Sequence, residues 1–409
     1  MNRCTVQLDV GDATLVNNPY EFFRYLRNES PIAELYGHEG VWIVSRYPDI
    51  KEVLGAPSFR SRPVDEVVPS RFVGTPTEIM WKNNLAFLEG SRHSRVRKTL
   101  IRPLNSMSGN HVESIVRDVV RRAVTEAVRK VSVDGCVSIA TKIPQAVICL
   151  LLRITNSEFD QMAVWTRDFL RIFLPEADDE ETSKLVNNAS MGFVTFLGDL
   201  IDRCAADPAD SLIDHLIQQN HEGNLSSGEL VATLRGVFTA GFETTAGTIS
   251  GLLLALSRDL ALLSRLRSDP SCIPAAVDEG LRWESPVQVV VRYLERDSVI
   301  GGCRIPKGAR LWLLLGSANH DDQIFGDPER FCLDRSSMNH LAFGGGRHKC
   351  AGLGLARLEL ASFLSEFSRL VSEVKVDEEQ VCRHMNLQFR SLSRLPLELV
   401  PLKSRETVA

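Results

Sequence analysis

The run Phe343-Gly-Gly-Gly-Arg-His-Lys-Cys-Ala-Gly352 decides how the rest of this sequence is interpreted. It delivers one cysteine to the start of Leu353–Ala361, where the spacing of apolar residues predicts a helix. Free amide N–H groups and the positive end of a helix favour thiolate over thiol, and glycines let the backbone fold tightly around a sulfur atom. Cys350 is therefore predicted to be a metal ligand or a nucleophile.

Other functions of a glycine-rich loop with a cysteine require particular residue spacings, which can be checked in this run. A phosphate-binding loop needs GxxxxGK followed by Ser or Thr, and a dinucleotide-binding loop needs GxGxxG; the run has neither pattern. Zinc would have to recruit His340, His348 and Cys350 without a CxxC pair, an HExxH motif or an obvious fourth ligand. A catalytic thiol needs a histidine base, and His348 on the same loop is poorly placed for that role. Both of these chemistries stay open as weak alternatives.

Composition sets the broad class of protein. The 409 residues carry a net charge of −5, with 44% hydrophobic and 24% charged residues, as in ordinary globular proteins. The acidic balance argues against nucleic acid as the main partner. The nine cysteines contain no CxxC pair, which is typical of reduced thiols and favours a cytoplasmic protein. Because Met1–Val10 lacks a signal-peptide run and no stretch approaches ~18 apolar residues, no membrane association is predicted.

Residue periodicity predicts a mainly α protein of the α+β class. Apolar residues recur at helical spacing from about Asn110 to Leu266, with a solvated acidic loop expected at Pro175–Thr182. No repeat or Gly/Ser linker marks a boundary, so one domain over residues 1–409 is predicted. Small sheets at one side are expected from a hairpin (Ala33–Leu35, Val41–Ser45), from strands after Pro286 (Val289–Leu294, Ser298–Ile300, Cys303–Ile305, Arg310–Leu315) and from a final pair (Met385–Arg390, Leu395–Pro401).

One long predicted helix has unusual residues near its middle. The capping-box pattern Ser226-Ser-Gly-Glu229 predicts its start, and the spacing continues to about Ser257, a length of roughly 48 Å. Gly241 in a helix interior costs about 1 kcal/mol relative to alanine, and the Thr244 hydroxyl can compete for backbone carbonyls. A weak point in a helix of this length needs a functional reason.

Four motifs in a fixed order carry a family resemblance. The cysteine run, written Phe343-Gly-x-Gly-x-His-x-Cys-x-Gly352, resembles the heme-binding signature of the cytochrome P450 family at every fixed position. Glu279-Gly-Leu-Arg282 resembles its ExxR helix, Ala240-Gly-Phe-Glu-Thr-Thr245 its oxygen-activating motif, and Ala318–Phe331 its meander. Asn18–Tyr20 and Trp42–Tyr47 extend the resemblance over most of the chain, and the length is similar to that of soluble bacterial members.

The resemblance implies a fold, a cofactor and a reaction. It implies the helix-rich cytochrome P450 fold and a heme-thiolate monooxygenase that uses heme b and O2. Cys350 would be the thiolate ligand of the iron. The other fixed positions of the cofactor-binding loop are Phe343, Gly344, Gly346, His348 and Gly352. A local opening of the long helix would let Thr244 hydrogen-bond dioxygen and Glu243 help relay protons to it.

Further charged residues are assigned by the same resemblance. Glu279, Arg282 and Arg330 would form a buried structural network behind the heme, needed for folding and heme retention. The cations that would bind the heme propionates are His93, Arg97, Arg292 and His348. The meander departs from the family pattern at His320 and Asp322, where arginine and proline are usual, which puts a local contact of that arginine in doubt.

The resemblance outlines a substrate and an electron donor. Substrate contacts would come from Arg62–Leu88, Phe169–Phe173 and Leu387, and from Ala240, Val287, Val290 and Val291. These residues are mostly apolar, which predicts a lipophilic small molecule, often a natural product in this family. Electrons would come from a ferredoxin or flavodoxin with its NAD(P)H-dependent reductase, docked on basic residues (Arg95, Lys98, Arg347, Lys349). The alternative is a heme-free helical binding or thiol protein.

Overall fold

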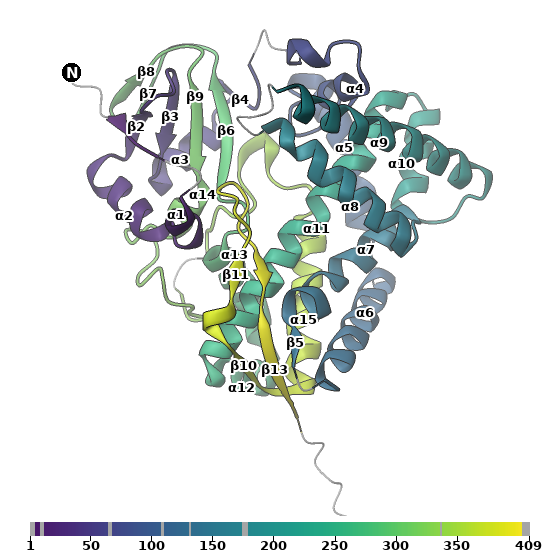
Figure 1. Cartoon of the computed structure of the whole chain (residues 1–409), viewed down its shortest axis with the longest axis vertical. Coiled ribbons are helices and arrows are strands. Elements are labelled where there is room, and N and C mark those ends of the chain that lie inside the picture. Colours follow the sequence, from purple (N-terminus) through teal and green to yellow (C-terminus); the bar gives the residue numbers. More distant parts are fainter. Residues whose placement is uncertain are drawn as a thin grey trace, which may run out of the picture. The chain divides into compact units, whose positions relative to one another are not determined.

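The computed structural model describes residues 5–8, 12–63, 68–107, 110–130, 132–173, 179–335 and 338–402 (Figure 1). Contacts divide the chain into two compact units. The first comprises Met1–Phe59, Val112–Pro144 and Glu243–Ala409, and the second comprises Arg60–His111 and Gln145–Phe242. The expectation of one domain stays a prediction.

The main sheet belongs to the first unit, apart from one residue of its last strand. Its order is β1 (Thr5–Val6), β2 (Ile32–Leu35), β3 (Val41–Val44), β9 (Arg310–Leu314), β6 (Val289–Leu294) and β4 (Phe59–Arg60). The predicted hairpin is confirmed, because β2 and β3 pair antiparallel with Ala33 opposite Ile43. Strand β6 has its predicted bounds, as do β7 (Ser298–Ile300) and β8 (Cys303–Ile305). Strand β9 ends one residue early, where helix α14 (Leu315–Asn319) begins.

Side-chain alternation along the sheet gives two buried layers. Trp42 of β3 belongs to a cluster with Ile50 of α3 (Tyr47–Gly55). Its neighbour Ile43 belongs to a second cluster with Phe23 of α2 (Tyr20–Glu29). Because successive side chains of a strand point to opposite faces, both faces of the sheet are covered by apolar side chains. This double burial explains why the strands were recognisable as apolar runs.

The predicted C-terminal strand pair is wrong in one partner. Strand β13 (Pro396–Pro401) pairs with β10 (Val371–Val376), and also with β5 (Val133–Asp134). Residues 385–390 form no strand with it and lie between β11 (Cys382–Arg383) and β12 (Leu392–Arg394), which pair with each other. The backbone of this segment bonds elsewhere, because the Arg390 N–H donates to the Pro286 carbonyl (2.9 Å).

The first unit contains further helices besides those that cover the sheet. Helix α13 (Ile273–Glu284) contacts α15 (Leu353–Leu370), which confirms the helix predicted after the cysteine run. The others are α1 (Ala13–Asn17), α12 (Leu260–Ser268) and most of α6 (Asn110–Val128), with a π-helical turn at Cys136–Ala140. Three-residue 3-10 turns of this unit lie at Pro270–Cys272, Gly346–His348 and Glu378–Gln380. Two further turns of this kind, Ser70–Phe72 and Arg171–Phe173, belong to the second unit.

Among its described residues, the regular elements of the second unit are helices, apart from Arg60 of strand β4. Its helices are α4 (Pro76–Lys82), α5 (Gly90–Met107), most of α7 (Lys142–Leu152), α8 (Asn156–Leu170), α9 (Glu180–Ala206) and α10 (Leu212–His221). The acidic loop predicted at 175–182 is wrong at its end, and residues 174–178 lie outside the described residues. Asp179 caps α9 by accepting the Thr182 N–H (2.7 Å), so the acidic residues at 180 and 181 form a first helical turn.

Helix α11 (Ser227–Arg258) passes from the second unit into the first at Glu243. Its capping box is confirmed, because Ser226 N–H donates to Glu229 and Glu229 N–H donates to the Ser226 hydroxyl (2.9 and 3.2 Å). Helix α11 is continuous through residues 240–245, where a local opening was expected. Gly241 has a packing reason instead, since a Cβ atom there would lie 2.7 Å from Ile148 of α7.

The mainly α prediction with small sheets is confirmed by these elements. Among the described residues, no single helix is long and apolar enough to span a bilayer. Two bent helix pairs meet the length and composition criteria only when each pair is taken together, namely Cys136–Leu152 with Asn156–Leu170, and Ser227–Arg258 with Leu260–Ser268.

Candidate active site

The cysteine loop is shaped by glycines with left-handed backbone torsions. Gly344 and Gly346 have φ values of +64° and +62°, which other residues rarely adopt. A Cβ atom at Gly346 would lie 2.0 Å from the Leu54 carbonyl oxygen, at the end of α3. The Cys350 N–H donates to the Phe343 carbonyl (2.9 Å), which closes the loop on itself. The loop therefore approaches α3 more closely than any side chain at position 346 would allow.

The donor set of this loop fits a heme ligated by one protein sulfur. Cys350 is half-buried and precedes Gly352, the N-cap of α15, which has no side-chain cap. Backbone N–H groups at that helix end favour a thiolate. The described residues contain no group of three His, Cys, Asp or Glu side chains suited to one metal ion. A porphyrin supplies four nitrogens itself, so a single thiolate completes its protein ligation, whereas zinc needs three or four protein ligands.

The residues that flank the loop bind it to neighbouring helices. Arg357 of α15 lies over the Phe343 ring (5.3 Å to the centroid) and donates to Asp278 of α13 (2.7 Å). His340, a candidate zinc ligand, contacts the same carboxylate (3.4 Å). This geometry gives His340 a structural role. Asp278 and Arg357 were not among the predicted site residues.

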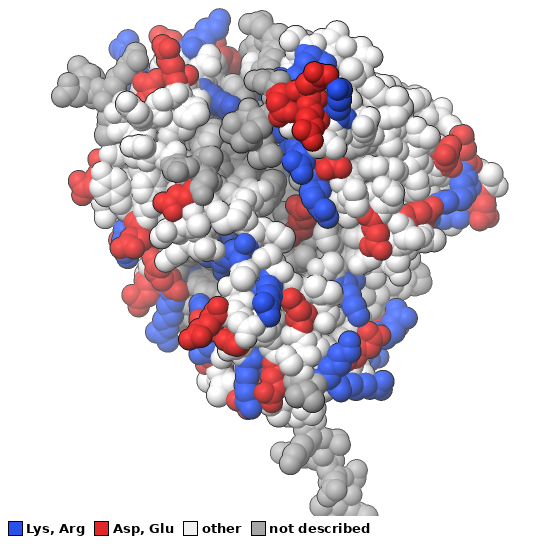
Figure 2. Space-filling model, in the orientation of Figure 1, with Lys and Arg blue, Asp and Glu red and all other residues white. Residues whose placement is uncertain are grey.

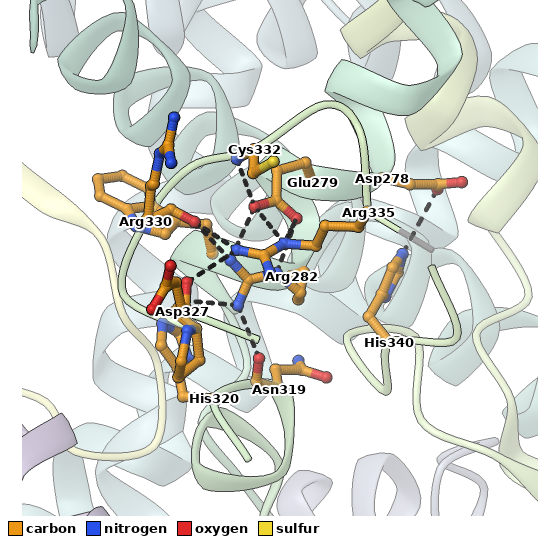
Figure 3. Close-up of polar contacts among 12 residues, drawn as sticks. Asp278, Glu279, Arg282, Asn319, His320, Asp327, Arg330, Cys332, Arg335 and His340 are labelled. Carbon is orange, nitrogen blue, oxygen red and sulfur yellow. Dashed lines mark hydrogen bonds and ion pairs between the residues drawn. The ribbon is translucent and has the colours of Figure 1, made fainter. Parts of the chain in front are cut away.

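The ExxR pair forms a buried network on α13 (Figure 3). Glu279 and Arg282 are both fully buried and joined by two hydrogen bonds (2.7 and 2.8 Å). Arg335 adds a second guanidinium to Glu279 (2.8 Å), and the Cys332 N–H donates to the same carboxylate (2.8 Å). Arg330 contributes its carbonyl oxygen, which accepts from Arg282 (3.3 Å), while the residue itself is exposed. The guanidinium expected from Arg330 is thus supplied by Arg335.

The same network reaches toward the cysteine loop through Asn319. Arg282 donates to the Asn319 carbonyl (2.8 Å), and the Asn319 amide donates to the Ser285 hydroxyl (2.8 Å). The Asn319 side-chain oxygen accepts the Leu341 N–H (2.6 Å), two residues before Phe343. Folding of the meander and placement of the loop are therefore coupled by hydrogen bonds.

His320 occupies the position where the family pattern has arginine. Its ring stacks on Tyr20 (3.7 Å between centroids), and its Nδ1 contacts the Gly316 carbonyl (3.1 Å). Complete burial, reinforced by the charge of Arg282, lowers the pKa of His320 well below its usual range. A neutral imidazole packed against an aromatic ring therefore occupies this position.

The acid–alcohol pair lies on α11. Glu243 and Thr244 are half-buried, whereas Thr245 is buried. The Thr248 hydroxyl donates to the Thr244 carbonyl (3.0 Å), one turn along the helix. Their roles in handling dioxygen and protons are proposals.

The predicted propionate ligands are distributed over both units. In the first unit, Arg292 of β6 is 8% exposed and donates to the Val291 carbonyl (2.7 Å), and His348 is half-buried. In the second unit, buried His93 and half-buried Arg97 lie one turn apart on α5. Their binding of propionates stays a prediction.

Two arginines of the basic helix α5 bind a buried acid of α11, a pairing that was not predicted. Buried Glu229 accepts from Arg92 (2.8 Å) and from both terminal nitrogens of Arg95 (2.8 and 3.0 Å). Burial alone would raise the pKa of Glu229, but hydrogen bonds from Arg95, Ser226 and Arg92 lower it to about 2. Arg95 is therefore committed within the second unit, whereas Lys98 is exposed.

The predicted substrate segments of the first unit meet. Val287 forms a bridge with Phe389, and the Gln288 N–H donates to the Gln388 carbonyl (2.8 Å). Val287 and Val290 are partly buried against the cluster that contains Trp42, and Leu387 is 8% exposed. Val291 is half-buried. Of the predicted substrate residues in the second unit, Ala240 is exposed and Phe169 is buried. Residues 64–67 of the predicted segment 62–88 lie outside the described residues. Substrate binding by these residues stays a prediction.

A single cysteine on a glycine loop and a buried ion-pair network in the same unit fit a heme-thiolate enzyme. A family profile described as cytochrome P450 matches residues 151–270 and 271–398. The chain therefore belongs to the cytochrome P450 family, as its motifs predicted.

Two relatives and one solved structure illustrate the similarity. The chain is 31% identical over 409 residues to the vitamin D(3) 25-hydroxylase of Pseudonocardia autotrophica, covering 97% of this chain and 98% of that one. It is 30% identical over 343 residues to the mycinamicin IV hydroxylase/epoxidase of Micromonospora griseorubida, covering 82% and 83%. CalO2 has the same fold, with a TM-score of 0.87 at 24% identity over 97% of this chain and 99% of that one.

Membership settles the class of reaction. The protein is a cytochrome P450 monooxygenase, an oxidoreductase whose cofactor is heme b and whose co-substrate is O2. Both relatives described above are named as hydroxylases. The family implies a lipophilic substrate and redox partners.

Proposed function

We propose that this enzyme hydroxylates a lipophilic natural product at a site built on Cys350, with electrons from a ferredoxin- or flavodoxin-type protein. The observation that carries the proposal is the glycine loop that closes on Cys350 at the start of α15. When bound, a heme with a thiolate ligand supplies the O2-dependent oxygen-inserting chemistry. The two relatives named as hydroxylases support this reaction.

Different residues of the chain would have different roles around the heme. Cys350 would hold the iron, and amide N–H groups of its loop would adjust the electron donation of the sulfur. Arg292, His348, His93 and Arg97 would neutralise the propionates. Thr244 would hold a hydrogen bond at the oxygen-binding side, and Glu243 would pass protons to it. The Glu279–Arg282 network would keep the loop in place through Asn319.

The first experiment tests the sulfur ligand. Reduced wild-type holoenzyme treated with carbon monoxide should show the displaced Soret band of thiolate-bound heme, and Cys350→Ser should lose it. Cys332→Ser, which changes another half-buried thiol, is the matched control and should retain the band. A Cys350→Ser protein with the wild-type spectrum would overturn the proposal.

A second experiment tests the acid–alcohol pair. With a surrogate redox system, Thr244→Ala should oxidise the electron donor but release hydrogen peroxide in place of product, because proton delivery is no longer ordered. Thr248→Ala, one turn away, should keep the wild-type ratio of product to electron donor. An unchanged ratio in Thr244→Ala would exclude the proposed role.

The electron donor is proposed to be acidic, and its docking can be tested by charge reversal. Figure 2 shows acidic and basic side chains interspersed on the face that it draws, so single positions must be compared. Lys98→Glu and Lys349→Glu should each slow reduction several-fold at low salt, with the difference fading as salt screens the charges. Lys184→Glu, an exposed residue of α9, is the control. Arg95 is unsuitable for this test, because reversing its charge would remove two hydrogen bonds from buried Glu229 and place a second acid beside it. Equal rates would place docking elsewhere.

A further inference from the structure

Arg235 of α11 is a buried cation without an anionic partner among the described residues. Only 3% of the residue is exposed. Its guanidinium carbon lies 4.4 Å from the centroid of the Phe169 ring on α8. Within the residues that the structure describes, its Nε has no hydrogen-bond partner, and no acid forms an ion pair with it. Burial lowers the pKa of Arg235 to about 10, so the group is still charged at neutral pH.

The contact with Phe169 does not engage the N–H donors of Arg235. A cation over an aromatic ring uses the face of the guanidinium, whereas its five N–H donors lie in the plane and point away from the ring. Buried donors in folded proteins are nearly always hydrogen-bonded, and an exception calls for a missing acceptor. A planar fork of N–H donors matches the two oxygens of a carboxylate.

Neighbouring hydroxyls are also unsatisfied. Thr239 follows Arg235 by one turn on the same face of α11, and its buried hydroxyl has no hydrogen-bond partner among the described residues. Thr166 precedes Phe169 by one turn on α8, and its hydroxyl is in the same condition. Three polar groups on two contacting segments therefore lack acceptors or donors, which is more than a single misplaced side chain would produce.

We propose that Arg235 and Thr239 bind a carboxylate of the substrate, so that the natural oxidation target is a lipophilic acid. This inference rests on the proposed function and names its substrate class. A single buried cation is neutralised by a monoanion, whereas a phosphate dianion would leave excess negative charge in an apolar setting. Arg235 and Thr244 lie on one continuous helix, and its rise per residue separates them by about 14 Å. Oxidation is therefore expected at a carbon remote from the carboxylate.

The test compares acids with their neutral counterparts on the holoenzyme. Unbranched fatty acids of eight to sixteen carbons, their methyl esters and the matching alcohols are titrated by the spin-state shift of the heme and, independently, by calorimetry. Wild type should bind at least one acid about tenfold more tightly than its ester and alcohol. In Arg235→Met this preference should fall to within about twofold, because the neutral side chain offers no charged donor.

Controls separate this inference from the proposed function. Arg258→Met makes the same change on the same helix at an exposed arginine and should keep the preference for the acid. The wild-type comparison needs no variant, so it decides the question even if Arg235→Met does not fold. No acid binding more tightly than its ester, or an Arg235→Met protein with the wild-type preference, overturns the carboxylate site. A wild-type protein without the thiolate spectrum overturns the proposed function itself.

Discussion

Arg282 and Arg235 are both buried arginines on helices, yet their surroundings are opposite. All five N–H donors of Arg282 are used, two by Glu279 and three by backbone carbonyls. Arg235 has an aromatic ring over its face and, among the described residues, no acceptor at its Nε. A buried cation with all its partners stabilises the fold that supplies them, whereas one without partners is a candidate for binding a ligand. The contrast separates a structural arginine from a recognition residue.

The same contrast exists between two buried carboxylates of the first unit. Glu279 accepts hydrogen bonds from Arg282, Arg335 and the Cys332 N–H. Glu359 of α15 is 2% exposed, and one of its oxygens has no hydrogen-bond partner among the described residues. Burial raises the pKa of Glu359 to about 8, so this acid is mostly protonated at neutral pH. An unpartnered acid can lose its charge in this way, and arginine cannot.

The largest expected effect comes from breaking the fully partnered network. Arg282→Met leaves Glu279 with one cation fewer and removes the link to Asn319, so the free energy of unfolding should fall by about 3–5 kcal/mol. Urea unfolding of the holoenzyme, followed by tryptophan fluorescence, measures this loss. Heme release should accelerate in parallel, because Asn319 positions the loop that carries Cys350. A loss below about 1 kcal/mol would show that the network is not what holds this region together.

The next effect is a pH dependence that belongs to Glu359. Below pH 4.5 the carboxyl is protonated in both states, but between about 4.5 and 8 only the unfolded chain releases the proton. Wild type should therefore lose stability as pH rises through this range, by about 1 kcal/mol per pH unit relative to Glu359→Gln. Urea unfolding at pH 5, 6, 7 and 8 measures the slope.

A matched variant checks that this slope comes from burial. The ion pair with Arg258 lowers the pKa of Glu378, so this acid is ionised in both states above pH 5. Glu378→Gln should follow the wild-type slope. If Glu359→Gln also follows it, Glu359 is already ionised in the folded protein.

The third prediction reverses the sign of the first. Arg235→Met replaces an unpartnered buried charge with an apolar side chain of similar length, which should stabilise the ligand-free enzyme by about 2 kcal/mol. The same unfolding experiment measures the gain, and Arg235→Lys, which retains the charge, should not show it. A loss similar to that of Arg282→Met would mean that Arg235 has structural partners after all.

Local sequence patterns predicted the parts of the site that depend on spacing. The Cys350 loop, the ExxR turn and the capping box of α11 each depend on residues within ten positions, so backbone geometry alone brings them together. Arg335 was missed because its partner Glu279 lies 56 residues earlier in the chain. The strand expected at 385–390 failed for the same reason, since its backbone bonds to the segment at 286–288. Long-range pairing has no local signal.

Arg235 did have a signal that could have found it. Positions three and four residues away on either side are Val231, Ala232, Phe238 and Thr239, so no acid can pair with it along the helix. A charge within an apolar stretch and without a local partner must find a distant acid, reach solvent or bind a ligand. Only the folded chain distinguishes these outcomes, because burial and the contact with Phe169 are tertiary facts.

The smallest expected change in the free energy of unfolding comes from an arginine that is paired but exposed. Arg258 lies on α11 like Arg235 and has an acid partner like Arg282, since it donates twice to Glu378 (2.7 and 2.9 Å), but 47% of its side chain is exposed. Because water already solvates both groups, Arg258→Met should change the free energy of unfolding by at most about 1 kcal/mol, and less at high salt. Urea unfolding at two salt concentrations measures it. A change as large as that of Arg282→Met would mean that pairing alone, without burial, determines what an arginine contributes to this fold.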